Sequence, residues 1–195
     1  MQKLYALREG AKQGKILRDG IQLVLAGAPN VGKSSLLNRL AGEEVAIVTP
    51  IAGTTRDRVK ESITIGGVPM HIIDTAGLRE TSDLVEAKGI ERSWEAIAAA
   101  DLVIFLQDPG SSETSTTSEI VELKGQILKA LPPRCPILEV NNKSDLLGGT
   151  ISSHPKKGSL FISAKTGDGI EDLKQKILEL VGWGGSQEGV IVARR

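Results

Sequence analysis

The residues with the clearest chemical potential are Gly27 to Ser34, a glycine-rich segment, GAPNVGKS, that ends in lysine and serine. An apolar run, Ile21 to Ala26, precedes it and the run SLLNRL follows it, so the pattern predicts a strand, a turn and a helix start. Such a turn directs backbone N–H groups and the positive end of a helix dipole at an anion. In this pattern the lysine lies along the β- and γ-phosphates and the hydroxyl ligates Mg²⁺, which assigns these roles to Lys33 and Ser34.

Three further motifs follow in a fixed order, each after an apolar run that predicts a strand. The segment 74–77, DTAG, offers a carboxylate for Mg²⁺ in Asp74 and, in Gly77, an N–H for a γ-phosphate. The segment 142–145, NKSD, offers a carboxylate that can accept both the N1–H and the 2-amino protons of guanine, a pair that adenine lacks. The segment 163–165, SAK, supplies a turn whose backbone N–H can donate to guanine O6. Together with the glycine-rich segment, these motifs predict a guanine-nucleotide site in which Lys143 lies over the base and ties its strand end to the phosphate loop.

Composition excludes several other classes. Lys plus Arg and Asp plus Glu both number 24, so no basic footprint indicates direct binding of RNA or DNA, although nucleic acid reached through another domain stays open. The single cysteine, Cys135, rules out an internal disulfide and fits a reducing compartment. His71 and His154 have no partner at zinc-ligand spacing. No apolar stretch approaches the ~18 residues that span a bilayer, and the N-terminus lacks a secretory core, so we expect a cytoplasmic protein with no membrane partner.

The rest of the chain supplies the elements that position the motifs. Gly66-Gly67 is a hairpin signature between two extended runs. With the phosphate-loop motif, the alternation of strands and helices predicts an α/β fold of the P-loop NTPase, Ras-like G-domain class. The sheet is expected to be six-stranded and mostly parallel, with one antiparallel edge strand and helices on both faces. The ligand then lies beyond the carboxyl ends of the strands. Expected strands are 21–26, 59–65, 68–73, 102–106, 137–140 and 160–162, and expected helices are 33–41, 86–100, 118–131 and 170–181.

The two ends of the chain differ from its centre. Residues 1–19 carry a helix-like apolar stripe interrupted by Gly10 and Gly14, which we interpret as the end of a preceding helical element or linker. Residues 20–183 form the predicted GTP-binding domain, and the glycine-rich residues 184–195 form a C-terminal linker segment. These features favour a domain cut from a longer protein.

Several longer segments resemble the MnmE (TrmE) family, the tRNA-modification GTPases of bacteria and organelles. They are GAPNVGKSSLLN at 27–38, VTPIAGTTRD at 48–57, DTAGLRE at 74–80, DLVE at 83–86 with GIERS at 89–93, and ARR at 193–195. The resemblance covers residues 15–195, and Pro50 departs from the acidic residue of many relatives. It implies an isolated G domain that hydrolyses GTP, without the family's folate-binding domain, most of its helical domain and its cysteine motif. In the full-length protein the implied partners are tRNA, modified at its wobble uridine, and the MnmG (GidA) flavoprotein.

The resemblance also implies roles for single residues. Ras-type enzymes place a glutamine just after DTAG, where this chain has Leu78, so another group must orient the attacking water. In the family this group is a glutamate matching Glu86, and a potassium ion does the electrostatic work of an arginine finger while two G domains pair across their nucleotide faces. Implied ligands are Ser34 and Thr55 for Mg²⁺, and Asn30, Thr49, Ile51 and Thr54 for K⁺; catalytic residues are Glu86, Gly77 and Lys33. GTP contacts are assigned to Asn30, Val31, Gly32, Lys33, Ser34, Ser35, Thr49, Thr54, Thr55, Asp74, Gly77, Asn142, Lys143, Asp145, Ser163, Ala164 and Lys165.

Other interpretations of these residues stay open. A second interpretation of Glu86 is an ordinary solvated glutamate in the first turn of a helix, where its charge interacts favourably with the helix dipole. A second interpretation of Asn30 is a turn former that tolerates unusual backbone angles. Arg56 can stabilise phosphate charge or pair with Asp57. For the whole chain, the alternatives are a GTP-switched dimerisation module and a ribosome-assembly GTPase of the Era or Der kind, which shares GTTRD and DTAG.

Overall fold

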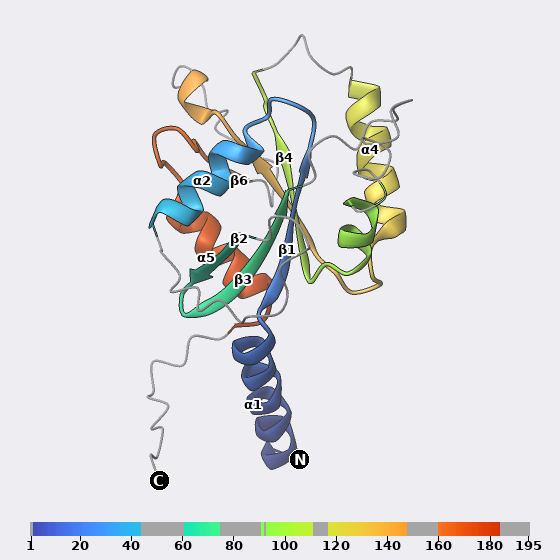
Figure 1. The fold of residues 1–195 in the computed structure, drawn as a ribbon, viewed down its shortest axis with the longest axis vertical. Coiled ribbons are helices and arrows are strands. Elements are labelled where there is room, and N and C mark those ends of the chain that lie inside the picture. The colour runs from blue at the N-terminus through green and yellow to red at the C-terminus, as the bar shows by residue number, and fades with distance from the viewer. Residues whose placement is uncertain are drawn as a thin grey trace, which may run out of the picture.

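A central sheet with helices on both faces organises the chain (Figure 1). The computed structural model describes residues 2–43, 61–74, 91, 93–110, 117–147 and 160–183. The six strands lie in the order β2-β3-β1-β4-β5-β6, and every neighbouring pair is parallel except β2 and β3. This confirms the predicted mostly parallel sheet with one antiparallel edge strand. The strands are β1 (Ile21–Gly27), β2 (Glu61–Ile65), β3 (Val68–Asp74), β4 (Leu102–Gln107), β5 (Ile137–Asn141) and β6 (Leu160–Phe161).

The helices cover the two faces of the sheet in pairs. Helices α2 (Lys33–Glu43) and α5 (Ile170–Leu180) lie on one face, and α4 (Thr117–Ala130) and the helical residues 93–98 lie on the other (Figure 1). A short 3₁₀ helix, η1 (Ser144–Leu146), follows β5. The helix expected to reach residue 100 ends at residue 98, because Ala100 N–H donates to Ile97 O and tightens the last turn to i→i+3 bonding.

Helix α1 (Gln2–Asp19) is continuous, so Gly10 and Gly14 do not interrupt it as the sequence suggested. A glycine inside a helix costs about 1 kcal/mol relative to alanine but leaves the backbone hydrogen bonds intact. The helix ends at Gly20, which has φ +71° and donates its N–H to Ile16 O at 3.0 Å. The side chain of Ile16 is buried, and Gln13 Nε2 donates to Gly182 O at 2.9 Å, so α1 is attached to the end of the domain where β1 begins.

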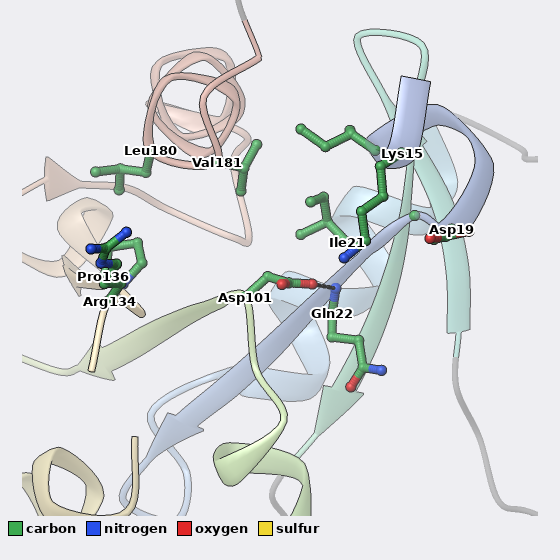
Figure 2. A pocket seen from close by; sticks show the side chains of 11 residues that line it. Lys15, Asp19, Ile21, Gln22, Asp101, Arg134, Pro136, Leu180 and Val181 are labelled. Atoms are coloured by element: carbon green, nitrogen blue, oxygen red, sulfur yellow. Dashed lines mark hydrogen bonds between the residues drawn. The ribbon is translucent and has the colours of Figure 1, made fainter. Parts of the chain in front are cut away.

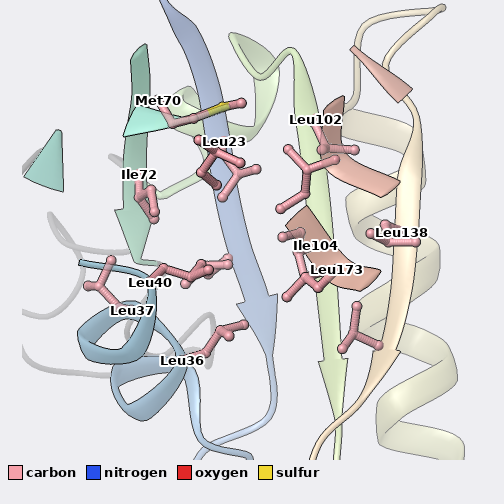
Figure 3. Packing of buried hydrophobic residues seen from close by; sticks show 14 of the residues in the cluster. Leu23, Leu36, Leu37, Leu40, Met70, Ile72, Leu102, Ile104, Leu138 and Leu173 are labelled. Carbon is pink, nitrogen blue, oxygen red and sulfur yellow. The ribbon is translucent and has the colours of Figure 1, made fainter. Parts of the chain in front are cut away.

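The core explains why the interior strands are apolar on both faces. In β4, Leu102 and Ile104 pack on the side of α2 and α5, whereas Val103 and Phe105 pack on the side of α4. This period-two alternation is expected of a parallel strand covered by helices on both faces. Figure 3 shows the first of these layers, in which Leu36, Leu37 and Leu40 of α2 and Leu173 of α5 meet residues of β1, β3, β4 and β5.

Candidate nucleotide-binding site

The phosphate loop, NKSD, SAK and Asp74, the first residue of DTAG, lie where the parallel strands end, at one edge of the sheet. The register of β1 pairs Leu25 with Asp74 of β3 and Gly27 with Leu106 of β4. The register then continues from β4 through β5 to β6, which carry the segments before NKSD and SAK. Because the strands run parallel in one order, their carboxyl ends form a continuous rim, and the predicted convergence is confirmed for the phosphate loop, NKSD, SAK and the first residue of DTAG.

The backbone of the phosphate loop, between β1 and α2, requires glycine at two positions. Gly27 has φ +149°, and a Cβ there would lie 2.4 Å from Leu106 O. Gly32 has φ +97°, and a Cβ there would lie 2.2 Å from Asn142 Nδ2. Asn30 is left-handed, with φ 61°, and its side chain is exposed. The turn-forming role of Asn30 is therefore confirmed, and an exposed amide on this loop stays free of the core to meet a ligand.

Lys33 is positioned by the loop that it closes. Its side chain is only 8% exposed, and Nζ donates to Gly27 O and Ala28 O, both at 3.0 Å. The ammonium group thus lies across the loop beside the first turn of α2, where Leu36 N–H already donates to Gly32 O at 2.9 Å. An ammonium and a helix N-terminus at one place favour a phosphate anion.

The hydroxyl groups next to Lys33 fit a hard cation held between protein and phosphate. Ser34 and Ser35 are exposed in the first turn of α2, and Val31 is buried beneath the loop. A serine hydroxyl is an oxygen ligand that suits Mg²⁺, an ion that keeps several water ligands and binds substrate phosphates. Among the described residues, no group of three or more His, Cys, Asp or Glu side chains is placed to hold a metal.

Asn142 joins the phosphate loop to the SAK loop. Its amide Nδ2 donates to Val31 O at 2.9 Å, and its Oδ1 accepts from Ala164 N–H at 2.9 Å. The residue is 2% exposed, so both bonds lie out of water. Asn142 therefore joins the two loops, and among the SAK-loop amides from which a donor to guanine O6 was expected, that of Ala164 is already bonded to protein.

Lys143 does not connect to the phosphate loop as the sequence suggested. Its Nζ pairs with Asp108 Oδ2 at 2.7 Å, and it is Asn142 that bonds to the phosphate loop. The backbone of Lys143 is left-handed, with φ 63°, at the start of η1. Asp108 lies just beyond the end of β4, its side chain is 9% exposed, and its Oδ1 also accepts from Gly110 N–H. The carboxylate is therefore placed to hold the ammonium at the rim.

Asp145, the predicted guanine-selecting residue, is exposed and oriented by a serine. Ser163 Oγ donates to Asp145 Oδ1 at 2.7 Å and accepts from Thr166 N–H at 3.1 Å. Ser163 is itself fully buried, so it acts as an internal support for the carboxylate. The SAK loop is also closed by Gly167 N–H, which donates to Ser163 O at 2.8 Å.

Two residues of this rim were missed by the sequence analysis. Asp108 carried a weak signal, because it is an acidic residue directly after a buried strand, as Asp74 is. Arg39 of α2 carried none, since its guanidinium bonds to Ala164 O and Lys165 O, about 125 residues away in the chain. Of the predicted site residues, Thr49, Ile51, Thr54, Thr55, Gly77 and Glu86 lie outside the described residues, as does Arg56, and of Asp74 the backbone alone is described.

A separate cavity of about 410 Å³ lies at the opposite end of the sheet, where the strands begin. Figure 2 shows Asp101 at its centre, with Oδ2 accepting from Gln22 N–H at 2.8 Å. Its lining includes charged side chains of both signs and apolar side chains. Its lining comprises Lys15, Ile16, Asp19, Gly20, Ile21, Gln22, Asp101, Arg134, Pro136, Leu180 and Val181.

The fold and the rim define a P-loop GTPase domain, and comparison with known proteins agrees. The chain belongs to the family described as 50S ribosome-binding GTPase, whose model matches residues 22–143. Among solved structures, it is similar to Era of Aquifex aeolicus bound to GDP·AlF4⁻, with 29% identity and a TM-score of 0.62 over 84% of this chain and 57% of that one. The G domain of the Thermotoga maritima iron transporter FeoB has 26% identity and a TM-score of 0.56, over 82% and 98% of the two chains. The chain is therefore a GTP-hydrolysing domain.

Curated sequences narrow the resemblance further. The tRNA modification GTPase MnmE of Polynucleobacter asymbioticus is 71% identical over 99% of this chain and 42% of its own length. MnmE of Bordetella parapertussis is 53% identical over 94% of this chain and 39% of its own length. The expected resemblance to MnmE is thereby confirmed. The chain spans about two fifths of the length of these relatives, and no helix among its described residues is long and apolar enough to cross a membrane.

Proposed function

We propose that this chain is the GTPase domain of a protein that modifies the wobble uridine of tRNA, activated by potassium and paired with a second copy across the nucleotide face. The observation that carries the proposal is the 71% identity with an MnmE protein over nearly the whole chain. The similarity to Era, at 29%, is far lower, which favours tRNA modification over ribosome assembly. The domain would then occupy residues 20–183, between helical residues 1–19 and a linker at 184–195.

The chain's own residues divide into binding and hydrolytic groups. The NKSD and SAK loops select guanine, and Lys33 with the first turn of α2 binds the phosphates. Asn30 and carbonyl oxygens of Thr49, Ile51 and Thr54 form an oxygen-only ligand set, which suits an alkali cation. When bound, that cation supplies positive charge at the β/γ bridge. The exposed amide of Asn30 on the left-handed turn supports its place in this set.

Two further assignments complete the hydrolytic group. Thr55 joins Ser34 as a ligand of Mg²⁺, and Gly77 N–H binds the γ-phosphate. Glu86 orients the attacking water, the task that Leu78 cannot perform. The partners of the whole protein would be tRNA and the MnmG flavoprotein, and its tRNA substrate would place it in the cytoplasm.

Potassium dependence tests the hydrolytic part of the proposal. Single-turnover GTP hydrolysis is measured in KCl and in NaCl at equal ionic strength, together with the mass of the complex in each salt. We expect faster hydrolysis and pairing in KCl, and Asn30→Ala should remove both while GDP binding persists. Asn38→Ala, an exposed asparagine on α2, is the matched control. Equal rates in the two salts for the unaltered chain would refute the cation site.

A domain exchange tests the tRNA part. This chain replaces the corresponding domain of the Polynucleobacter asymbioticus relative, and wobble-uridine modification is measured by mass spectrometry of tRNA. We expect the chimera to modify tRNA, and a Glu86→Ala chimera to fail. A GTP-hydrolysing chimera that leaves tRNA unmodified would favour the alternative of a GTPase with another output.

A further inference from the structure

Arg39 connects the helix of the phosphate loop to the loop that faces the base. It lies in the middle of α2, where Nε donates to Ala164 O at 3.1 Å and Nη2 donates to Lys165 O. The guanidinium also lies against Gly167, since a Cβ built there would be 3.8 Å from Cζ and Nη1 of Arg39. Two successive carbonyl groups of the SAK loop are therefore held by one planar fork, a geometry that arginine provides and lysine does not.

Holding these carbonyls also sets the direction of the amides that follow them. A peptide unit is planar and trans, so its C=O and N–H point to opposite sides. With Lys165 C=O fixed toward Arg39, Thr166 N–H points away and donates to Ser163 Oγ at 3.1 Å. With Ala164 C=O fixed in the same way, Lys165 N–H is also turned away from Arg39.

The contacts of Arg39 continue to the guanine-selecting carboxylate. Ser163 Oγ, which accepts from Thr166 N–H, donates its own proton to Asp145 Oδ1 at 2.7 Å. Each group in this series donates in the same direction, from the guanidinium through a peptide unit and a hydroxyl to the carboxylate. Hydrogen bonds aligned in this way polarise one another, and the charged donor at the start strengthens the series.

We propose that Arg39 is a positioning residue for guanine recognition, acting on Asp145 through the Lys165–Thr166 peptide and Ser163. It fixes the carboxylate that receives the N1–H and 2-amino protons, and it acts through the SAK-loop carbonyls to which its guanidinium bonds. The proposal rests on the assignment of the base to the NKSD and SAK loops. It predicts that Arg39 affects discrimination at the 2-amino group, which a residue that merely anchors the loop would not affect.

The test compares GDP with inosine diphosphate, which lacks the 2-amino group but keeps N1–H and O6. Dissociation constants of both are measured by competition with a fluorescent GDP analogue, and ADP is included as the adenine reference. For Arg39→Ala, we expect GDP to bind on the order of tenfold more weakly, the scale of one charge-assisted bond. We expect a smaller loss for inosine diphosphate, so the ratio of the two constants should fall about threefold or more.

Two further variants make the result specific. Arg18→Ala removes an exposed arginine whose guanidinium pairs with its neighbour Asp19 at 2.7 Å on α1, and it should leave both constants unchanged. Arg39→Gln keeps a long side chain with a single amide donor group, and it replaces the alanine variant if thermal unfolding shows that variant to be unfolded. We expect Arg39→Gln to give an intermediate ratio.

The outcomes separate the inference from the site on which it depends. A lower GDP-to-inosine preference in the folded Arg39 variants supports the proposal. Equal weakening of both nucleotides, or no weakening, overturns it and leaves Arg39 as a loop anchor. If the unaltered chain binds ADP as tightly as GDP, the assignment of guanine to this rim fails, and the inference fails with it.

Discussion

Replacing Asn142 with alanine should lower the free energy of unfolding by about 2–4 kcal/mol, because two buried hydrogen bonds are lost and their partner groups are left buried without a hydrogen bond. The two bonds join Asn142 Nδ2 to Val31 O and Oδ1 to Ala164 N–H, each at 2.9 Å. Each of the two partner groups left unpaired, Val31 O and Ala164 N–H, costs about 1–3 kcal/mol, which gives a summed range of about 2–6 kcal/mol. Water entering the space left by the amide recovers part of this penalty, so we expect the lower half of the summed range.

The assay is urea unfolding followed by fluorescence of Trp94 and Trp183, with Asn38→Ala as the control. Asn38 is exposed on α2, so its replacement should change the free energy of unfolding by no more than about 0.5 kcal/mol. Asn142→Asp provides a second comparison, because a carboxylate keeps the acceptor for Ala164 N–H but places a negative oxygen against the Val31 carbonyl. Its deficit should shrink as the pH falls and the new carboxyl protonates. If Asn142→Ala matches the control, the bridge between the two loops does not stabilise the domain.

Four further changes have defined outcomes. Glu86→Ala should slow single-turnover hydrolysis by a factor on the order of 10²–10⁴ with nucleotide affinity retained, and a rate within twofold of the unaltered chain would remove this residue from the mechanism. Asp145→Asn should weaken the binding of GTP by about 2 kcal/mol or more, measured by parallel titrations with GTP and ATP. An unchanged preference for GTP over ATP would contradict the guanine assignment. Gly20→Ala should lower the free energy of unfolding by about 1–2 kcal/mol, because Gly20 has a positive φ and the added Cβ would lie 2.8 Å from Nε2 of His71. Gly14→Ala, whose added Cβ lies in open space, should be neutral or stabilising. Burial, followed by the nearby Asp101 charge, raises the pKa of the Cys135 thiol from 9.0 to about 11. The folded chain therefore holds this proton more tightly than the unfolded chain, and the free energy of unfolding should fall between about pH 9 and 11. Cys135→Ala should reduce that fall when unfolding is measured as a function of pH.

The sheet and its motifs were predictable because their signals are local. Interior strands such as β4 are apolar at every position but the last, as burial on two faces requires, and Gly66-Gly67 marks the antiparallel turn between β2 and β3. The phosphate loop was equally readable, since the positions of Gly27 and Gly32 leave no room for a side chain. The signals themselves, an apolar run and glycines at a fixed spacing, are formed by residues that are neighbours in the sequence.

The errors arose where side chains reach across the fold. Lys143 was expected at the phosphate loop, but Asp108, 35 residues away, holds its ammonium. The contact of Arg39 with the SAK loop joins residues about 125 positions apart, and no spacing pattern records such a pair. Helix α1 was misjudged for a different reason, because two glycines lower helix propensity without removing a backbone hydrogen bond.

The contacts at the rim imply that guanine recognition and hydrolysis can be altered separately. Asn142 connects the phosphate loop to the SAK loop, and Ser163 and Arg39 extend that connection to Asp145 and to α2. These bonds are made within the protein, so the nucleotide does not need to supply the energy that orders them, which favours affinity. Rate variants should therefore come from the proposed hydrolytic residues, such as Asn30 and Glu86, and affinity variants from this bonded group. A single-turnover rate that falls in proportion to affinity across Asn142 and Arg39 variants at saturating GTP would show that the two functions are coupled.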